Sequence, residues 1–456
     1  MKKLVFLLLL VIGVAQAQTV PSTRFDQVID ANFTAGEPGG VALVAQHGHV
    51  LYECAFGMAD LQLGVKMQPD MVFQIASMTK QFTAVCILQL AERGKLGLQD
   101  NISRYIAGCP EAWSEITIEH LLTHTSGIKD RREALQLQEF GEKEQSPGAL
   151  IDLFKADTSA FAPGTRWAYS NSGYMVLGYI LEKVSGMSYG AYLEKNIFGP
   201  LQMDHSGYRA ESVTIVPGLV SNYVPVKDGF GNANLGYHLP FSAGGIYSTV
   251  EDMLKWNQGL LAGKVVKKEA LAKAWTSYVL ADGRPAHYGY GWQVDGTIQG
   301  SPTIEHSGNI PGFMSDGLYL AAADIYVVVL LNRRDHGEGL AELVAGQLAS
   351  ALLGKRKDLQ EIVMSDDSLK TYTGFFATSQ SSAYHIVLLQ HRLYCQKPDG
   401  SNRFMLIPYA AGRFYSDNAE ISFSRDAGGQ ISSFTATNTR HPAAPVLFKK
   451  TDKPLN

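Results

Sequence analysis

The sequence lacks the features that mark membrane-spanning, nucleic-acid-binding and disulfide-stapled proteins. Beyond Val14 no apolar run is long enough to cross a bilayer, and the net charge of −4 offers no basic field for nucleic acid. The four cysteines show neither a disulfide framework nor metal-ligand spacing. They are Cys54, Cys86, Cys109 and Cys395. Stability must therefore come from packing, and we expect no metal or other cofactor, no nucleic-acid partner and no membrane insertion.

The N-terminal segment is typical of a secretory signal peptide. Lys2 and Lys3 form a short basic start, residues 4–14 are almost entirely apolar, and Ala15-Gln16-Ala17 matches a small-x-small cleavage site. The apolar run is too short to span a bilayer. We therefore expect residues 1–17 to be removed and the mature protein to be periplasmic or secreted.

Residues 18–355 show strand patterns at both ends and helical patterns between them. Two strands joined at His47-Gly48 are predicted within residues 41–57. Later strands are predicted at 289–294, 303–306, 313–320 and 325–331, and helices at 77–94, 174–184, 189–197, 249–261 and 340–353. This order predicts an α/β domain in which both ends of the segment build one antiparallel sheet covered by helices.

After a predicted linker at 356–368, residues 369–456 contain short strand patterns only. The predicted strands are 383–390, 392–397, 404–409, 413–416, 421–424 and 431–435. Turn sequences such as Pro398-Asp399-Gly400 separate some of them. The pattern predicts a small up-and-down β-barrel.

Ser77-Met78-Thr79-Lys80 is the first candidate catalytic motif. On a helix, residues three apart share a face, so the Lys80 amine can reach the Ser77 hydroxyl. A serine needs an adjacent base to attack a carbonyl, and a desolvated lysine can supply it. Taken alone, the motif fits an N-cap serine followed by a surface lysine better. The helix is apolar on nearly every side, however, so a lysine within it needs a reason to be buried.

Two further triplets could complete a site around Ser77. In Tyr169-Ser170-Asn171 the phenol and the amide are two residues apart and can face the same way, and a tyrosinate near a lysine can act as a base. A simple turn before the next helix explains this triplet equally well. His306-Ser307-Gly308 ends a predicted strand, where Gly308 would admit a substrate backbone and an N–H could help to form an oxyanion hole.

In chain order, the three motifs resemble the signature of the penicillin-recognising serine hydrolases: S-x-x-K, Y-x-N and a K-T-G-like triplet. The likeness is greatest to the branch of class C β-lactamases, D-alanyl-D-alanine carboxypeptidases, D-aminopeptidases and esterases. It covers about Arg24 to Leu353, and the further matching stretches are 73–77, 120–127, 244–249 and 288–292. The resemblance implies an α+β sandwich of the β-lactamase/transpeptidase type, and a lipocalin-like C-terminal barrel such as some D-aminopeptidase-type relatives carry.

By that resemblance Ser77 is the acylated nucleophile, Lys80 and Tyr169 share proton transfer, and Asn171 orients the substrate. Which of Lys80 and Tyr169 is the formal base stays open. The reaction implied is a two-step acyl transfer on an amide or ester bond of a small molecule or short peptide.

The resemblance also implies substrate binding by the third motif. His306, Ser307 and Gly308 contact the substrate, and the N–H groups of Ser77 and Asn309 form the oxyanion hole. Class C β-lactamases carry lysine at the position of His306. A histidine there is usual among the D-peptidases and esterases of the family. Because histidine is cationic only below about pH 6.5, we expect weak, pH-dependent binding of substrate carboxylates.

Two other patterns fit known motifs less well. Residues 186–190 match G-x-S-x-G, but a helix precedes them where the nucleophile elbow needs a strand, so Ser188 is expected to cap a helix. His120 and His124 have the spacing of a zinc pair without the glutamate of H-E-x-x-H, so metal ligation is not expected.

The predicted substrates are D-amino-acid peptides, because the C-terminal domain resembles that of D-aminopeptidase-type relatives. The alternatives are a carboxylesterase or a class C-type β-lactamase, and a penicillin-binding sensor that deacylates slowly. The sequence indicates neither the oligomeric state nor whether the barrel contributes to the site.

Overall fold

The computed structural model describes residues 22–130, 146–156, 159–210, 214–233, 240–334, 339–354, 359–378, 382–398, 400, 403–416, 419–441 and 444–451. The expected signal peptide, residues 1–17, lies outside them. Among the described helices, none is long and apolar enough to cross a bilayer.

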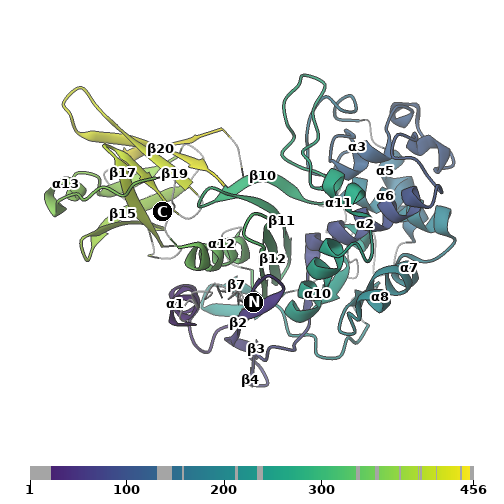
Figure 1. Cartoon of the computed structure of the whole chain (residues 1–456), viewed down its shortest axis with the longest axis horizontal. Coiled ribbons are helices and arrows are strands. Elements are labelled where there is room, and N and C mark those ends of the chain that lie inside the picture. The colour runs from purple at the N-terminus through teal and green to yellow at the C-terminus, as the bar shows by residue number, and fades with distance from the viewer. Residues whose placement is uncertain are drawn as a thin grey trace, which may run out of the picture.

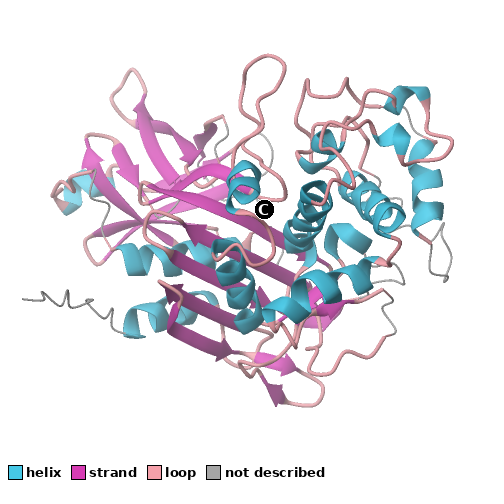
Figure 2. Ribbon diagram, turned by 45° about the vertical axis from the view of Figure 1, so that its right-hand side comes forward, coloured by secondary structure: helices cyan, strands magenta, loops and turns pink. Residues whose placement is uncertain are grey.

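A six-stranded antiparallel sheet forms the centre of the larger domain (Figures 1 and 2). Its strand order is β10-β11-β12-β13-β1-β2. The strands are β1 (Gly40–Gln46), β2 (His49–Phe56), β10 (Gln293–Ile298), β11 (Ser301–Ile310), β12 (Phe313–Leu320) and β13 (Ile325–Leu331). β1 pairs with β13, so the N-terminal hairpin joins the late strands as predicted.

Helices cover both faces of this sheet. α1 (Ser22–Asn32) and α12 (Leu340–Leu353) cover one face, and the layer containing α2 (Thr79–Glu92) and α10 (Val250–Leu261) covers the other. Alternate residues of β1 enter two separate cores, with Val41 and Leu43 in one and Ala42 and Val44 in the other. Because both faces are buried, the strand is a continuous apolar run rather than an alternating one.

α2 lies inside the helical layer. Its residues from Thr79 to Leu90 are all buried, as its apolar sequence predicts, and Gly94 (φ 65°) follows its end. The predicted helix starts with a 3-10 turn, η1 (Ala76–Met78), before the α-helical part. The other α-helices in the described part of this domain are α3 (Ile118–Leu122), α5 (Pro147–Lys155), α6 (Asn171–Ser185), α7 (Tyr189–Leu193), α8 (Gly199–Leu201), α9 (Phe241–Gly244) and α11 (Lys268–Ala274).

Short strands connect these helices to the rest of the domain. A three-stranded sheet has the order β5-β9-β6, and two hairpins are formed by β3 with β4 and by β7 with β8. Their bounds are β3 (Met58–Asp60), β4 (Val65–Lys66), β5 (Phe73–Gln74), β6 (Gly207–Tyr208), β7 (Tyr223–Val226), β8 (Gly229–Asn232) and β9 (Ile246–Ser248). The β5–β9 pair fixes the chain immediately before η1.

The strand predicted at 289–294 is wrong in position, because β10 starts at Gln293. A Cβ on Gly289 would lie 2.0 Å from the Ala274 carbonyl oxygen, and one on Gly291 would lie 2.7 Å from that of Lys80. This segment therefore packs its backbone against α11 and α2, which the glycines permit, instead of extending in the sheet.

The C-terminal domain is a closed eight-stranded barrel (Figure 1). Its strands are β14 (Gly374–Ala377), β15 (Ala383–Leu389), β16 (Arg392–Gln396), β17 (Phe404–Ala410), β18 (Arg413–Tyr415), β19 (Ala419–Arg425), β20 (Ile431–Asn438) and β21 (Val446–Thr451). The sequence predicted six of them and missed β14 and β21, whose mutual pairing closes the barrel. α13 (Asp366–Lys370) overlaps the predicted linker and contributes Leu369 to the barrel core.

Candidate active site

Ser77 lies in the η1 turn, between β5 and α2. The Ile75 N–H donates to the Ile246 carbonyl (3.0 Å), and the Ser315 hydroxyl donates to the Ile75 carbonyl (2.8 Å). Ala76 has a φ of 48°, in the left-handed region that residues with a side chain rarely adopt. Ala76 is fully buried whereas Ser77 is partly exposed, so the turn presents the Ser77 hydroxyl to a reactant.

Lys80 is buried one turn later on the same face of α2, as the spacing predicted. Its Nζ lies 3.1 Å from Ser77 Oγ, 2.8 Å from Asn171 Oδ1 and 2.7 Å from the Ala243 carbonyl oxygen. The Lys80 amine also lies over the Tyr169 ring, 4.8 Å from its centroid. These contacts bring the first two motifs together. The Ala243 carbonyl on α9 is a contact that no sequence motif indicated.

Asn171 is the first residue of α6, which the Ser170 hydroxyl caps by accepting from the Gly173 N–H (3.1 Å). Asp130 accepts both from the Asn171 backbone N–H (3.2 Å) and from Asn171 Nδ2 (3.1 Å). Because the amide nitrogen is held by a carboxylate, the amide oxygen must face Lys80. Asp130 therefore orients a predicted site residue, and sequence reasoning missed it.

His124 supports the loop that carries Tyr169. The two ring centroids are 4.4 Å apart, and His124 Nδ1 accepts from the Ser170 N–H (3.1 Å). Burial and then the charge of Lys80 lower the pKa of His124 well below its usual value, so the ring is neutral. His120 Nδ1 accepts from the Thr117 N–H (3.2 Å). One nitrogen of each histidine in the zinc-like pair thus accepts a backbone hydrogen bond.

His306 is buried in β11 and does not present a positive charge. Its Nδ1 donates to the Ser307 carbonyl (2.6 Å), and its Nε2 accepts from the Tyr288 hydroxyl (2.8 Å), which suits the neutral ring. Burial and the charge of Lys80 lower the pKa of His306 to about 3. The neutral ring argues against the expected pH-dependent attraction of substrate carboxylates, because burial disfavours the charged form of an imidazole.

Gly308 brings β11 against the nucleophile turn. A Cβ at Gly308 would lie 2.3 Å from the Ile75 carbonyl oxygen and 2.4 Å from Ser315 Oγ. Gly308 is therefore required for the packing of β11 against the Ser77 turn. Its place in the sequence had predicted that it would admit a substrate backbone. The pairs between β10 and β11 end at Glu305, so the following residues to Ile310 pair with β12 alone. Asn309 lies in this stretch, next to the turn that contains Ser77.

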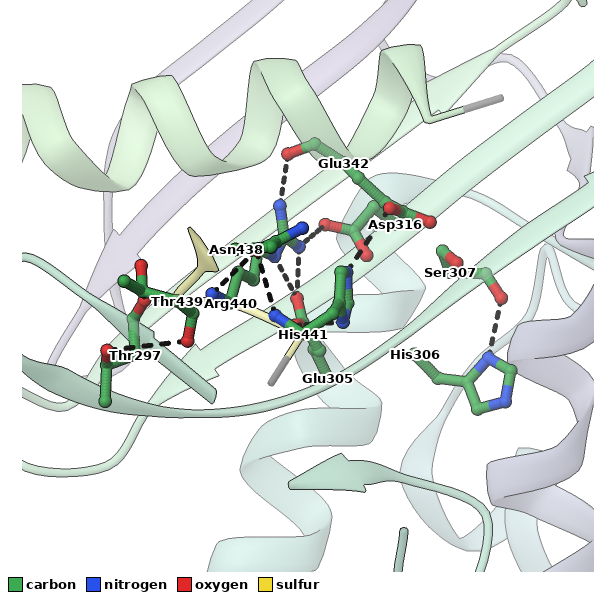
Figure 3. A network of polar contacts seen from close by, with 10 residues as sticks. All are labelled: Thr297, Glu305, His306, Ser307, Asp316, Glu342, Asn438, Thr439, Arg440 and His441. Atoms are coloured by element: carbon green, nitrogen blue, oxygen red, sulfur yellow. Dashed lines mark hydrogen bonds and ion pairs between the residues drawn. The ribbon is translucent and has the colours of Figure 1, made fainter. Parts of the chain in front are cut away.

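Ser307 points away from this side of the strand. It pairs with Asp316 across β11 and β12, and its side chain interacts with Glu342 of α12 (Figure 3). Of the predicted site residues, Ser77 and Asn171 both contact Lys80, and Tyr169 lies beside Lys80. The Tyr169 and His306 rings are 6.2 Å apart between centroids, so the third motif adjoins this group.

The fold and these contacts are those expected of the β-lactamase family of serine hydrolases. Residues 25–350 match the family model described as Beta-lactamase, which is more than half of the chain, and the protein belongs to this family.

Several named relatives are similar to this chain. Penicillin-binding protein 4* of Bacillus subtilis is 26% identical over 85% of this chain and 91% of its own length. A D-aminopeptidase of Gluconobacter oxydans is 26% identical over 70% of this chain and 59% of its own length. Esterase EstB of Burkholderia gladioli is 29% identical over 63% of this chain and 84% of its own length. The family thus includes relatives named for different substrates.

A solved structure extends the likeness of the fold to almost the whole chain. The octameric penicillin-binding protein homologue from Pyrococcus abyssi aligns with a TM-score of 0.64 at 24% identity, covering 94% of this chain and 98% of that one. A match of this extent includes most of the C-terminal barrel, so the barrel also has a counterpart among known folds.

Proposed function

We propose that Ser77 is the nucleophile of an acyl-enzyme mechanism and that Lys80 is its base. The observation that carries this proposal is the position of Lys80 Nζ, 3.1 Å from Ser77 Oγ and held there by two further oxygens. As a neutral amine, Lys80 can donate its two N–H bonds to Asn171 and Ala243 and direct its lone pair at the Ser77 hydroxyl. It then takes the Ser77 proton as the oxygen attacks.

Lys80 is proposed to transfer the proton again when the tetrahedral intermediate collapses. Protonated Lys80 returns the proton to the leaving nitrogen or oxygen as the carbonyl–leaving-group bond breaks, with Tyr169 beside it as the relay. Water then attacks the acyl-Ser77 ester, and Ser77 regains its proton when the acid is released. The N–H groups of Ser77 and Asn309 are proposed to stabilise the oxyanion in both steps.

For substrates we propose peptides or amides of D-amino acids. The D-aminopeptidase relative and the C-terminal barrel support this choice, and neutral His306 argues against a dedicated carboxylate site of the lysine type. Ester hydrolysis, supported by the esterase relative, is the second candidate. We also propose that the protein acts outside the cytoplasm, which the composition of residues 1–17 supports. Sequencing of the mature N-terminus tests this, and Gln18 is the residue expected there.

One panel of substrates tests both the nucleophile and the substrate class. Nitrocefin, a short-chain p-nitrophenyl ester and a D-alanine p-nitroanilide are assayed with the wild type, with Ser77→Ala and with Ser188→Ala. Ser188 is the matched control, because its hydroxyl accepts from the Ala191 N–H and caps α7. We expect Ser77→Ala to lose at least about 10⁴-fold in turnover and Ser188→Ala to stay within about threefold.

The outcome also separates the alternatives. Preference for the D-alanine p-nitroanilide over the ester and nitrocefin supports a D-peptidase, and preference for the ester supports an esterase. A penicillin adduct that persists without turnover indicates a slowly deacylating sensor. Turnover that survives Ser77→Ala removes Ser77 from the nucleophile's role.

A further inference from the structure

A loop of the barrel inserts an arginine into the larger domain (Figure 3). Arg440 lies between β20 and β21, and its side chain is 1% exposed. Its guanidinium pairs with Glu305 on β11 and with Asp316 on β12, and its Nη1 donates to the Glu342 carbonyl on α12. One side chain of the barrel thus joins two strands and a helix of the other domain.

The two carboxylates lie directly behind the third motif. Glu305 precedes His306, and Asp316 is the register partner of Ser307. Because side chains alternate along a strand, Glu305 and Ser307 face α12, whereas His306 faces the opposite side and binds Tyr288. The barrel therefore contacts the rear of the strand whose front adjoins Ser77 and Lys80.

The buried carboxylates depend on Arg440 for compensation. Each is at most 1% exposed. One oxygen of each, Glu305 Oε1 and Asp316 Oδ1, has no hydrogen-bond partner within the described part of the chain. His441 adds a longer ion pair to Glu305 Oε1, at 3.6 Å. Burial raises the pKa of the Asp316 carboxyl although the charge of Arg440 opposes this shift. Loss of Arg440 would leave uncompensated polar groups beside the motif.

The loop itself is built to hold the arginine in place. Asn438 Oδ1 accepts from the N–H groups of Arg440 (2.9 Å) and His441 (3.0 Å), which fixes the turn. Thr439 bonds to β10, since its carbonyl accepts from the Thr297 N–H (2.6 Å) and its hydroxyl donates to the Thr297 carbonyl (3.0 Å). The loop is therefore fixed to β10 as well as to β11, β12 and α12.

We propose that Arg440 is a positioning residue of the active site, holding β11 so that the backbone from His306 to Asn309 keeps its place against the Ser77 turn. The barrel is then a part of the catalytic unit, and the hydrolase site is complete only with the barrel loop in place. This inference rests on the proposed function of Ser77, because the consequence of displacing β11 is slower acylation.

The test uses full-length variants that separate positioning from charge balance. Arg440→Met removes the guanidinium, and Arg440→Lys keeps a charge but cannot span three acceptors. The triple variant Glu305→Gln/Asp316→Asn/Arg440→Met removes all three charges at nearly constant shape, which relieves the buried-charge penalty. Arg425→Met is the matched control, since Arg425 is an exposed barrel arginine that donates within its own turn, to the Gly429 carbonyl (2.7 Å).

Two readouts are measured for each variant. The first is the single-turnover acylation rate with nitrocefin or with the best substrate of the panel above. The second is hydrogen–deuterium exchange of residues 303–310, with residues 41–45 of β1 as the internal reference. We expect acylation to slow by about 10- to 100-fold in Arg440→Met and in the triple variant, because a small displacement at the site is costly. We expect faster exchange in β11 and unchanged rates in Arg425→Met.

The triple variant decides the matter even if Arg440→Met fails to fold. A triple variant with a wild-type melting temperature, wild-type acylation and wild-type exchange in β11 would show that Arg440 only balances charge, and would overturn the proposal. The exchange measurement is independent of catalysis. If Ser77→Ala kept its activity, the proposed function would fail while the exchange in β11 still reported whether Arg440 holds the strand.

Discussion

Two cations are buried near the third motif, and their surroundings differ. Lys80 and Arg440 are 0% and 2% exposed, respectively. Lys80 donates to neutral oxygens of Ser77, Asn171 and Ala243, whereas Arg440 pairs with the carboxylates of Glu305 and Asp316. Adjacent carboxylates hold a guanidinium charged.

The difference shows how one fold uses the same type of charge in two ways. Lys80 can give up its proton because the oxygens around it accept hydrogen bonds from an amine as well as from an ammonium. Arg440 remains charged at all working pH values, and its planar fork suits several fixed acceptors. Proton transfer is therefore the role proposed for the lysine, and positioning the role proposed for the arginine.

The largest effect is expected from Lys80→Arg, which replaces the Lys80 amine with a guanidinium like that of Arg440. A guanidinium keeps the charge but cannot be deprotonated, so turnover should fall by about 10³-fold, as for loss of a general base. Lys183→Arg is the control, because Lys183 is exposed on α6. Steady-state assays with the preferred substrate measure both. A Lys80→Arg enzyme within about tenfold of the wild type would show that Lys80 transfers no proton.

A smaller effect is expected from Gly308→Ala, which acts on the front of the strand that Arg440 holds from behind. The new methyl would lie 2.3 Å from the Ile75 carbonyl oxygen, so β11 and the Ser77 turn must separate. We expect acylation to slow by about 100-fold. Gly148→Ala in α5 is the control, since the nearest atom there is 3.9 Å away. Equal acylation rates in the two variants would contradict close packing at Gly308.

The smallest effect concerns His306, a buried side chain whose ring stays neutral. The pKa of His306 is lowered to about 3, so the ring does not titrate between about pH 5.5 and 8. We therefore expect the KM of a carboxylate-bearing substrate to be flat over this range. A KM that falls on acidification in the wild type but not in His306→Gln would restore the cationic role.

The same shift makes folding sensitive to acid. Unfolded His306 takes up a proton below about pH 6.5, whereas the folded ring stays neutral until about pH 3, so its contribution to stability is present above 6.5 and is lost as the pH falls. At about pH 5 the loss is about 2 kcal/mol. Urea unfolding at about pH 7 and pH 5 should show His306→Gln losing less stability than the wild type by this amount.

The sequence predicted the features of the fold and the site that depend on residues close together along the chain. The S-x-x-K spacing on a helix that is apolar on nearly every side predicted that Lys80 would be buried against Ser77, and strand patterns placed β12 and β13 at their observed bounds. The resemblance supplied the link between the three motifs, which local patterns alone left open.

The sequence could not predict the contacts and the burial that only the tertiary fold creates. Asp130 reaches Asn171 across 41 residues and Arg440 reaches Glu305 across 135, and neither lies in a motif. The charge state of His306 depends on its burial and on Lys80, which the triplet His-Ser-Gly does not encode. A strand was predicted over residues 289–294, whereas the glycines at 289 and 291 serve close backbone packing.

The most direct measurement is the mass of the acyl-enzyme and the place of its acyl group. The protein is mixed with a β-lactam or with the preferred ester, quenched in acid, and mapped by peptide mass spectrometry, with Lys80→Arg alongside. One acyl group per chain on the peptide that contains Ser77, formed rapidly in the wild type and about 10³-fold more slowly in Lys80→Arg, is the predicted result. An adduct on Ser188 or another residue, or turnover with no adduct at Ser77 under single-turnover conditions, would contradict it.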